Sequence, residues 1–145
     1  MGGIKRTPAD AAFSNCVRER SNWHCERCGT KYEGDTRGLD CSHYMGRSAK
    51  ATRYDPLNAF AHCRGCHQYL SSNPPLFCEH YSDTFGAEDK MLEHFRDVDR
   101  GRRAHRELKE IAKHYREEHA RMQAMRANGI MGRIEFTDYF ERDES

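Results

Sequence analysis

Near the start of the chain, apolar residues recur at helical spacing. Phe13 and Val17 lie four positions apart, as they would on one face of a helix. Thr7 precedes them as a candidate N-cap, a proline follows it directly, and Asp10 stands three residues after the cap, which is the arrangement of a capping box. This pattern predicts a helix over residues 8–21.

The second half of the chain carries a longer stripe of the same kind. Residues 102–127 hold apolar side chains three, four or seven positions apart, and the Asn-Gly pair at 128–129 supplies a stop. Residues 76–95 predict one or two further helices with a break near Gly86, and residues 130–140 alternate weakly, as in a tail that docks on the body or contacts a partner. The members of the long stripe are Ala104, Leu108, Ile111, Tyr115, Met122 and Met125.

Between the helical segments, the pattern favours short strands and an exposed loop. Residues 39–44 and 57–62 are candidate strands, whereas residues 46–54 are polar and basic. We therefore expect an α+β fold in a single domain. Its expected parts are an N-terminal helix (1–22), a central core (23–75), a helical region (76–129) and an acidic aromatic tail (130–145).

Composition makes the expected core thin. Of the 145 residues, 37% are hydrophobic and 32% are charged, which is polar for a globular chain. No apolar run approaches the ~18–20 residues that span a bilayer, and no signal-peptide pattern opens the chain. We therefore expect a cytoplasmic protein with no membrane partner.

The net charge of +1 conceals a strong local pattern. Residues 41–75 hold four basic residues and one acid, and residues 100–126 hold nine bases and four acids. Residues 79–99 and 134–145 are acidic in compensation. Separate blocks of like charge can form a polyanion-binding face within a neutral protein, although ordinary solvated helix faces would give the same pattern.

The cysteines fall into two closely spaced pairs and three single residues. Cys25 and Cys28 form one pair with a two-residue gap, and Cys63 and Cys66 form the other. Two such pairs complete a closed tetrahedral site, so we expect a structural Zn²⁺, whose binding would add to the folding free energy of a thin core. Chance spacing and a redox dithiol are the alternatives, although redox chemistry needs only one pair.

The remaining cysteines and most histidines need no metal to explain them. Cys16 and Cys41 are expected to pack as small apolar side chains, and Cys78 and His80 are expected to be structural. A contact between His105 and nucleic-acid phosphates stays open. The histidines expected to be solvated on helices are His94, His105, His114 and His119.

Four motifs between and beyond the cysteine pairs have a known parallel. They are Asp-x-x-His-Tyr (40–44), Arg-Tyr-Asp (53–55), Asn-Ala-x-x-x-Cys-x-x-Cys (58–66) and Leu-Ser-x-Asn (70–73). Over residues 23–73 they resemble the phage NinG/Rap family of recombination nucleases, within the HNH, or ββα-metal, superfamily. The resemblance implies a small ββα-metal core around one divalent ion, pinned by the Cys₄ zinc and flanked by the N-terminal helix and C-terminal helices.

The resemblance also implies a role for each motif residue. His43 would be the general base that takes a proton from the attacking water. Asp40 and His67 would hold Mg²⁺ or Mn²⁺, with Asp40 reaching the ion through a β-bulge. Asn58 would bond the backbone across the loop and fix His43. The expected phosphate contacts are Arg47, Lys50, Arg53 and Arg64.

The implied activity is hydrolysis of DNA phosphodiester bonds. The family likeness points to branched recombination intermediates, such as Holliday junctions and D-loops, and symmetric junction cleavage would favour a homodimer. Two alternatives remain. One is a non-catalytic zinc-containing module that binds DNA or protein, and the other is an HNH nuclease that nicks or restricts ordinary duplex DNA.

Overall fold

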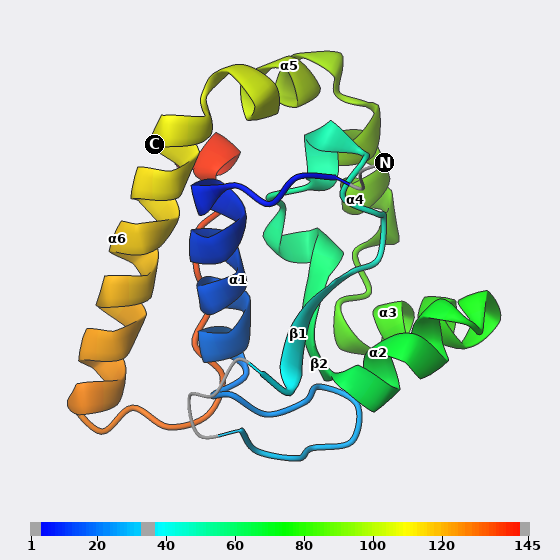
Figure 1. Cartoon of the computed structure of the whole chain (residues 1–145), viewed down its shortest axis with the longest axis vertical. Coiled ribbons are helices and arrows are strands. Elements are labelled where there is room, and N and C mark those ends of the chain that lie inside the picture. The colour runs from blue at the N-terminus through cyan, green and yellow to red at the C-terminus, as the bar shows by residue number, and fades with distance from the viewer. Residues whose placement is uncertain (1–3, 33–36, 143–145) are drawn as a thin grey trace.

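The computed structural model, which describes residues 4–32 and 37–142, has helices around a small antiparallel sheet (Figure 1). The architecture is mixed helix and strand, as the sequence pattern predicts. In chain order the elements are α1 (Pro8–Arg20), β1 (Leu39–His43), η1 (Lys50–Thr52), η2 (Pro56–Asn58), β2 (Ala59–Cys63), α2 (Arg64–Ser71), α3 (Pro74–Thr84), α4 (Glu88–Arg96), α5 (Val98–Arg106), α6 (Leu108–Ala127) and η3 (Tyr139–Glu141).

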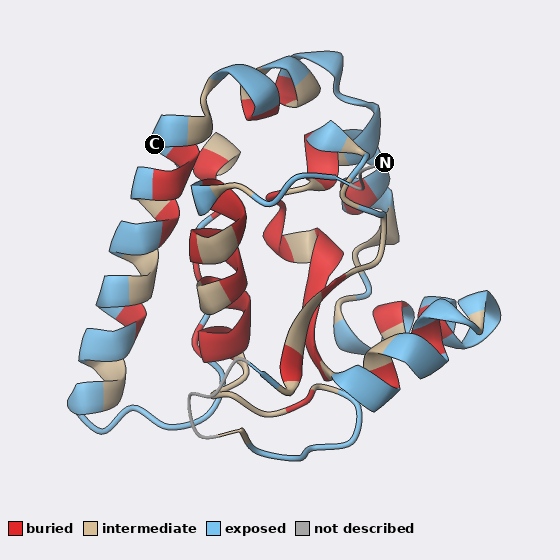
Figure 2. Cartoon of the chain, in the orientation of Figure 1, coloured by how far each residue is buried: buried red, intermediate tan, exposed pale blue. Residues whose placement is uncertain are grey.

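Helix α1 begins as its sequence predicts. The Thr7 amide donates to Asp10 Oδ2 over 2.7 Å, and the Asp10 amide donates back to Thr7 Oγ1 over 3.2 Å, so both halves of the capping box are present. Most of α1 is buried between α6 and the sheet (Figure 2). The helix thereby forms the wall on which one face of the sheet rests.

The two strands pair in a regular antiparallel ladder. Leu39 lies opposite Cys63 and His43 lies opposite Ala59, with every intermediate residue paired in step. The prediction of a β-bulge near Asp40 is therefore wrong, because the ladder is regular there. Because side chains alternate along a regular strand, the two faces of β1 carry different residues. His43 faces α1, where its ring lies 6.0 Å from that of Phe13.

Apolar side chains pack on both faces of the sheet. One cluster joins α1, α6 and the C-terminal tail, and it includes the fully buried Phe13, Val17 and Tyr115. The second cluster lies on the opposite face under α2 and α3. Its buried members are Phe60, Leu70, Phe77, Tyr81 and Met91.

The single helix expected over residues 102–127 is wrong, because the chain breaks at Glu107. That residue has φ −107° and ψ 34°, outside helical geometry, and separates α5 from α6. Its carboxylate accepts hydrogen bonds from Arg103 Nε (3.0 Å) and from the Tyr139 hydroxyl (2.6 Å). The break lets α5 pack across η1. At the other end, α6 stops at Ala127 as expected, with Gly129 at φ +89°.

The tail after α6 docks on the body, which is one of its two expected behaviours. Ile134, Phe136 and Tyr139 are each buried. Phe136 lies 5.9 Å from the ring of Phe13 and 5.8 Å from that of Tyr115, so it fills the seam between α1 and α6. None of the helices within residues 4–32 and 37–142 combines the length and apolar character needed to cross a bilayer.

Candidate active site and metal centre

The four paired cysteines converge at one point between the turn at Cys25–Gly29, which we call the first knuckle, and the start of α2. The four Sγ atoms all lie within 4.8 Å of one another, and those of Cys28 and Cys63 are 3.8 Å apart. Ligands placed tetrahedrally about 2.3 Å from a zinc ion are separated by about 3.8 Å. Cys25, Cys28, Cys63 and Cys66 could therefore bind one zinc ion with little movement.

Local structure holds each pair in place. Gly29 has φ +80°, a left-handed conformation that lets the chain turn sharply after Cys28. Cys63 is the N-cap of α2, and its Sγ accepts a hydrogen bond from the Cys66 amide over 3.4 Å. The Glu26 amide donates to the Ala61 carbonyl over 2.7 Å, so the first knuckle is also bonded to the free edge of β2.

The surroundings act on the four thiols in opposite directions. Burial raises the pKa of the Cys25 thiol and raises that of Cys66 to about 12, whereas Cys28 is exposed. Hydrogen bonds from the Thr30 side chain and backbone lower the pKa of the Cys28 thiol to about 6. Arg27 Nη1 lies 3.5 Å from Cys66 Sγ, and its guanidinium stacks 4.4 Å from the Tyr69 ring. A fixed cation beside the cluster would offset part of the charge of four thiolates.

Asp40 and His67 meet on the sheet face that α2 covers. His67 Nδ1 donates to Asp40 Oδ2 over 2.9 Å, and Arg64 Nε lies 3.2 Å from the same oxygen. Partial burial opposes ionisation, but the hydrogen bonds from His67 and Arg64 hold the pKa of Asp40 below its usual value. Adjacent ligands of an octahedral ion with bonds of about 2.1 Å lie about 3 Å apart, so this pair could hold one edge of such an ion once the His67 proton moves from Nδ1 to Nε2.

His43 sits at the end of β1 with one nitrogen fixed. Its Nε2 lies 2.9 Å from the Arg53 carbonyl, which can only accept, so Nε2 carries the proton and Nδ1 keeps its lone pair. Among the described residues, Nδ1 has no hydrogen-bond partner, and His43 lines a hollow of about 400 Å³. Burial lowers the pKa of His43 to about 4, against the opposing effects of the Arg53 carbonyl and Asp10. The ring is therefore neutral at pH 7.

Asn58 closes the loop that follows His43. Its Nδ2 donates to the Met45 carbonyl (2.8 Å) and the Thr52 carbonyl (2.9 Å), and its Oδ1 accepts from the Met45 amide (2.6 Å). The side chain is completely buried. Through these bonds, Asn58 fixes the loop whose Arg53 carbonyl orients the His43 ring.

The structure does not bring His43 to the Asp40–His67 pair. A three-residue step along β1 corresponds to about 10 Å, and the odd step places the two side chains on opposite faces. The two sites nevertheless adjoin. Asp40 and His67 line a hollow of about 500 Å³, His43 lines another of about 400 Å³, and Ser71 lines both.

The four expected phosphate contacts divide into two groups. Arg53 is committed to Asp10, at 2.6 Å, and Arg64 to Asp40. Arg47 and Lys50 have no ion-pair partner among the described residues. Arg53 therefore serves to hold the N-terminal segment on the loop, whereas Arg47 and Lys50 remain available to a ligand.

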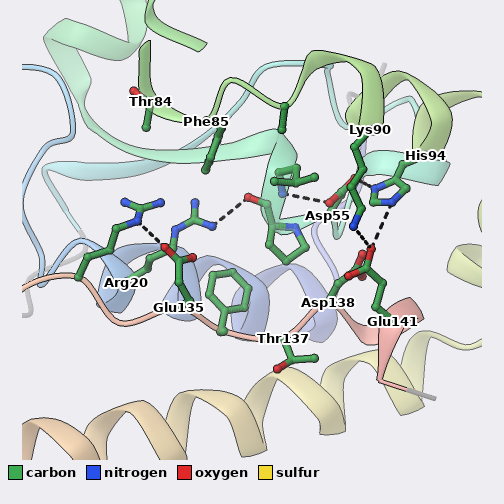
Figure 3. A pocket seen from close by; sticks show the side chains of 15 residues that line it. Arg20, Asp55, Thr84, Phe85, Lys90, His94, Glu135, Thr137, Asp138 and Glu141 are labelled. Carbon is green, nitrogen blue, oxygen red and sulfur yellow. Dashed lines mark hydrogen bonds and ion pairs between the residues drawn. The ribbon is translucent and has the colours of Figure 1, made fainter. Parts of the chain in front are cut away.

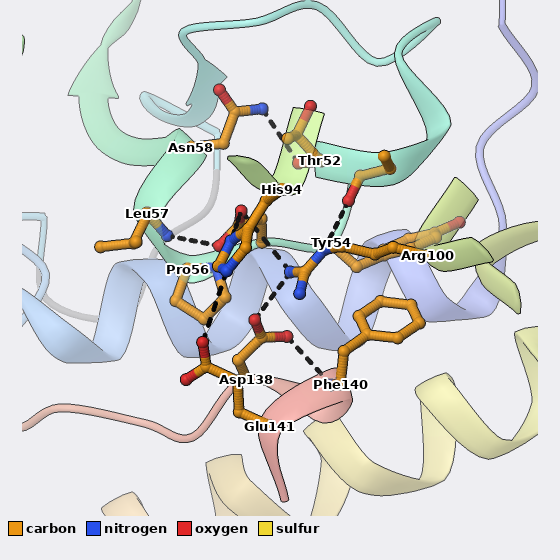
Figure 4. A network of polar contacts seen from close by, with 12 residues as sticks. Thr52, Tyr54, Pro56, Leu57, Asn58, His94, Arg100, Asp138, Phe140 and Glu141 are labelled. Carbon is orange, nitrogen blue, oxygen red and sulfur yellow. Dashed lines mark hydrogen bonds and ion pairs between the residues drawn. The ribbon is translucent and has the colours of Figure 1, made fainter. Parts of the chain in front are cut away.

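A network centred on His94 and Arg100 has no signal in the sequence, and the expectation that His94 is solvated is wrong (Figure 4). His94 Nδ1 lies 2.7 Å from Asp55 Oδ2, and Arg100 Nη2 lies 2.7 Å from Asp138. The side-chain ligand atoms of Asp55, His94 and Asp138 also lie within 4.8 Å of one another, which is close enough to bind one metal ion. Arg100 lies between the carboxylates, 3.5 Å from Asp55, so a cation already occupies this place.

The hollow beside this network is also lined by charged groups that pair with one another. It measures about 580 Å³ and lies between α4 and the tail (Figure 3). Its charged groups pair with one another: His94 Nε2 lies 3.4 Å from Glu141, and Lys90 lies 3.2 Å from the same carboxylate. We interpret the network as the clamp that fixes the tail.

Two further histidine predictions need correction. His114 Nε2 lies 2.7 Å from the Thr137 carbonyl, and His119 Nε2 lies 3.2 Å from Glu19, so neither is simply solvated. His80 has a structural place, as expected: its Nε2 lies 2.9 Å from that of the fully buried His62. No family model, curated protein or solved structure matches the chain.

Proposed function

We propose that this chain is a metal-dependent DNA endonuclease of the HNH type. The observation that carries the proposal is the contact between Asp40 and His67, 2.9 Å apart, across β1 and α2. A carboxylate and an imidazole suit Mg²⁺ or Mn²⁺ and can extend to other divalent ions. The order β1, β2, α2 and the adjoining cysteine cluster support the same assignment.

In this proposal the cysteine cluster holds a structural Zn²⁺. Four thiolates close the coordination sphere, so the ion leaves no position for substrate. Its role is to fasten the knuckle at Cys25 and Cys28 to the start of α2. Since His67 follows Cys66 directly, the zinc would also set the position of this catalytic ligand.

The chemistry divides between His43 and the divalent ion. His43 Nδ1 takes a proton from water, whose oxygen attacks phosphorus, and the P–O3′ bond breaks. Asp40 and His67 would hold the divalent ion, which would supply charge stabilisation for the departing 3′ oxygen, and that oxygen would receive a proton from water. The products are a 5′-phosphate and a 3′-hydroxyl.

In-line attack suits the separation of the two groups. A general base lies about 3 Å from the water that it activates, and this water lies about 3–3.5 Å from phosphorus. These lengths account for more than half of the about 10 Å between Asp40 and His43 along the strand, and Asp40 and His67 would hold the ion on the side of the leaving group. We place the scissile phosphate over Ser71, where the two hollows meet.

The proposed substrate is branched DNA, such as a Holliday junction or a D-loop, cut by a homodimer. Arg47 and Lys50 would contact backbone phosphates beside His43. Such contacts carry no base information, so recognition would depend on DNA shape and on salt concentration.

Cleavage of a substrate panel by the zinc-loaded protein tests the proposal. Linear, nicked, flapped and four-way DNA would be incubated with Mg²⁺ or Mn²⁺, and His43→Ala and Asp40→Asn compared with the control Lys113→Ala on the exposed face of α6. We expect cutting of branched DNA that needs the ion, is abolished in Asp40→Asn and is roughly 10²–10⁴-fold slower in His43→Ala. Cleavage that persists unchanged in His43→Ala would remove His43 from its role.

A non-catalytic zinc module is the second candidate. The observation that favours it is the double pairing of Asp40, which already binds both Arg64 and His67. Such a triad could be purely structural. DNA binding without cleavage of any substrate, with either ion, would establish this alternative.

A further inference from the structure

Three segments that are distant in sequence enclose a small basic hollow. It measures about 210 Å³ and lies where the N-terminal segment and the loop before η2 meet the junction of α5 and α6. We call it the basic pocket. The residues that line it are Lys5, Thr7, Lys50, Arg53, Tyr54, Ala104, His105 and Leu108.

The charge on its rim is uncompensated. Lys5, Lys50 and His105 are exposed, and none of these three side chains has an ion-pair partner in residues 4–32 and 37–142. Arg53, which also lines the pocket, pairs with Asp10 at 2.6 Å, so these two charges neutralise each other. Two lysine charges therefore remain, and His105 adds a hydrogen-bond donor.

The floor of the basic pocket is apolar and rigid. Tyr54 and Ala104 are almost completely buried, and Leu108 is half-buried. The Tyr54 hydroxyl is held 3.1 Å from Thr7 Oγ1, and its carbonyl accepts from the Tyr115 hydroxyl over 2.6 Å. Cations above a low-dielectric wall focus the electric field, so the hollow attracts an anion more strongly than scattered surface lysines would.

We propose that the basic pocket binds a backbone phosphate of DNA. Arg53 connects it to the candidate active site, because the side chain lines the pocket while the carbonyl of the same residue holds His43 Nε2 at 2.9 Å. The basic pocket is thus joined to His43 through a single residue of the loop. The choice of DNA as the source of the phosphate rests on the proposed function; the anion chemistry of the pocket does not.

Equilibrium binding in the absence of added divalent ion tests this assignment. The affinity of zinc-loaded protein for a duplex and a four-way junction would be measured over a range of salt concentrations. In Lys5→Ala/Lys50→Ala we expect several-fold weaker binding to both DNAs. We also expect the salt slope to become shallower by about 0.9 for each duplex phosphate that the variant no longer neutralises. Lys5→Arg/Lys50→Arg should keep the wild-type slope.

A matched control removes the same charge elsewhere. Lys113→Ala/Arg116→Ala deletes two exposed cations of α6 that do not line the pocket, and it should leave the slope near wild type. Equal effects of the two double variants would overturn the assignment, as would a wild-type chain that does not bind DNA. A third result would also overturn it: inorganic phosphate perturbs the His105 signals in NMR spectra but displaces no DNA, and the salt slope of DNA binding in Lys5→Ala/Lys50→Ala equals that of the wild type. Failure of cleavage alone, with the binding results as expected, would reject only the nuclease proposal.

Discussion

Asp40 and His43 lie three residues apart on one regular strand, and their side chains leave it on opposite faces. Asp40 turns toward α2 and bonds to His67, whereas the His43 ring packs toward Phe13 of α1. One ion cannot be ligated by both residues in this geometry. Ion binding and water activation are therefore assigned to separate groups that meet only across a substrate.

This separation predicts that ion affinity and cleavage can be uncoupled. Asp40→Asn should abolish Mn²⁺ binding, measured by electron paramagnetic resonance or calorimetry. His43→Ala should bind Mn²⁺ as the wild type does, yet cleave roughly 10²–10⁴-fold more slowly, as expected when a general base is removed. If His43→Ala weakened Mn²⁺ binding as much as Asp40→Asn, His43 would be a ligand and the assignment would be wrong.

The environment of His43 predicts a loss of stability in acid. Burial lowers its pKa from the ordinary 6.5 to about 4, so between these values the unfolded chain binds more protons than the folded one. The contribution of His43 to stability is thus complete above pH 6.5 and declines as the pH falls toward 4. Urea unfolding at pH 7 and pH 5 should show a smaller pH dependence in His43→Asn. His105→Asn, at an exposed histidine, is the control, and an equal change in both variants would contradict the prediction.

The cysteine cluster predicts that metal removal disrupts the knuckle. We expect about one zinc ion per chain, and stripping it with a chelator should weaken the packing of Cys25–Gly29 against β2 and the start of α2. Hydrogen exchange should then rise at the Glu26 amide, which donates to Ala61. Cys28→Ser should bind zinc more weakly. Cys78→Ser, at an exposed cysteine outside the cluster, should behave as wild type, and zinc release by both variants would contradict the assignment.

Local signals in the sequence are sufficient for much of the fold. The capping box at Thr7 and Asp10, the stop at Gly129 and the two cysteine pairs each depend on residues a few positions apart. The break at Glu107 cannot be found this way, because Glu107 is held by Tyr139, 32 residues further along the chain. The helical stripe simply continues across the break.

Local sequence signals likewise predict only part of the candidate site. The resemblance of the sequence motifs predicts roles for Asp40, His43 and His67, and alternation along a strand also predicts that the side chains of Asp40 and His43 point to opposite faces. The commitment of Arg53 to Asp10 and the burial of His94 could not be predicted, since both depend on contacts between segments about 40 residues apart. Charge pattern alone does not distinguish a paired cation from a free one.

The clamp around Arg100 predicts a large loss of stability from one substitution. Arg100 is 5% exposed; it donates to the Ala51 carbonyl over 2.7 Å and to Asp138 over 2.7 Å. Arg100→Met would keep most of the volume but leave the Asp138 carboxylate buried without its cation and Asp55 with His94 alone, at a cost of about 3–5 kcal/mol in the free energy of unfolding. Because burial already raises the pKa of Asp138 to about 6, the variant should recover part of this loss as the pH falls from 7 to 5.

Arg102→Met, at an exposed position of the same helix, should change the unfolding free energy by less than about 0.5 kcal/mol. Equal urea midpoints for the two variants would show that the tail is held by its apolar contacts alone.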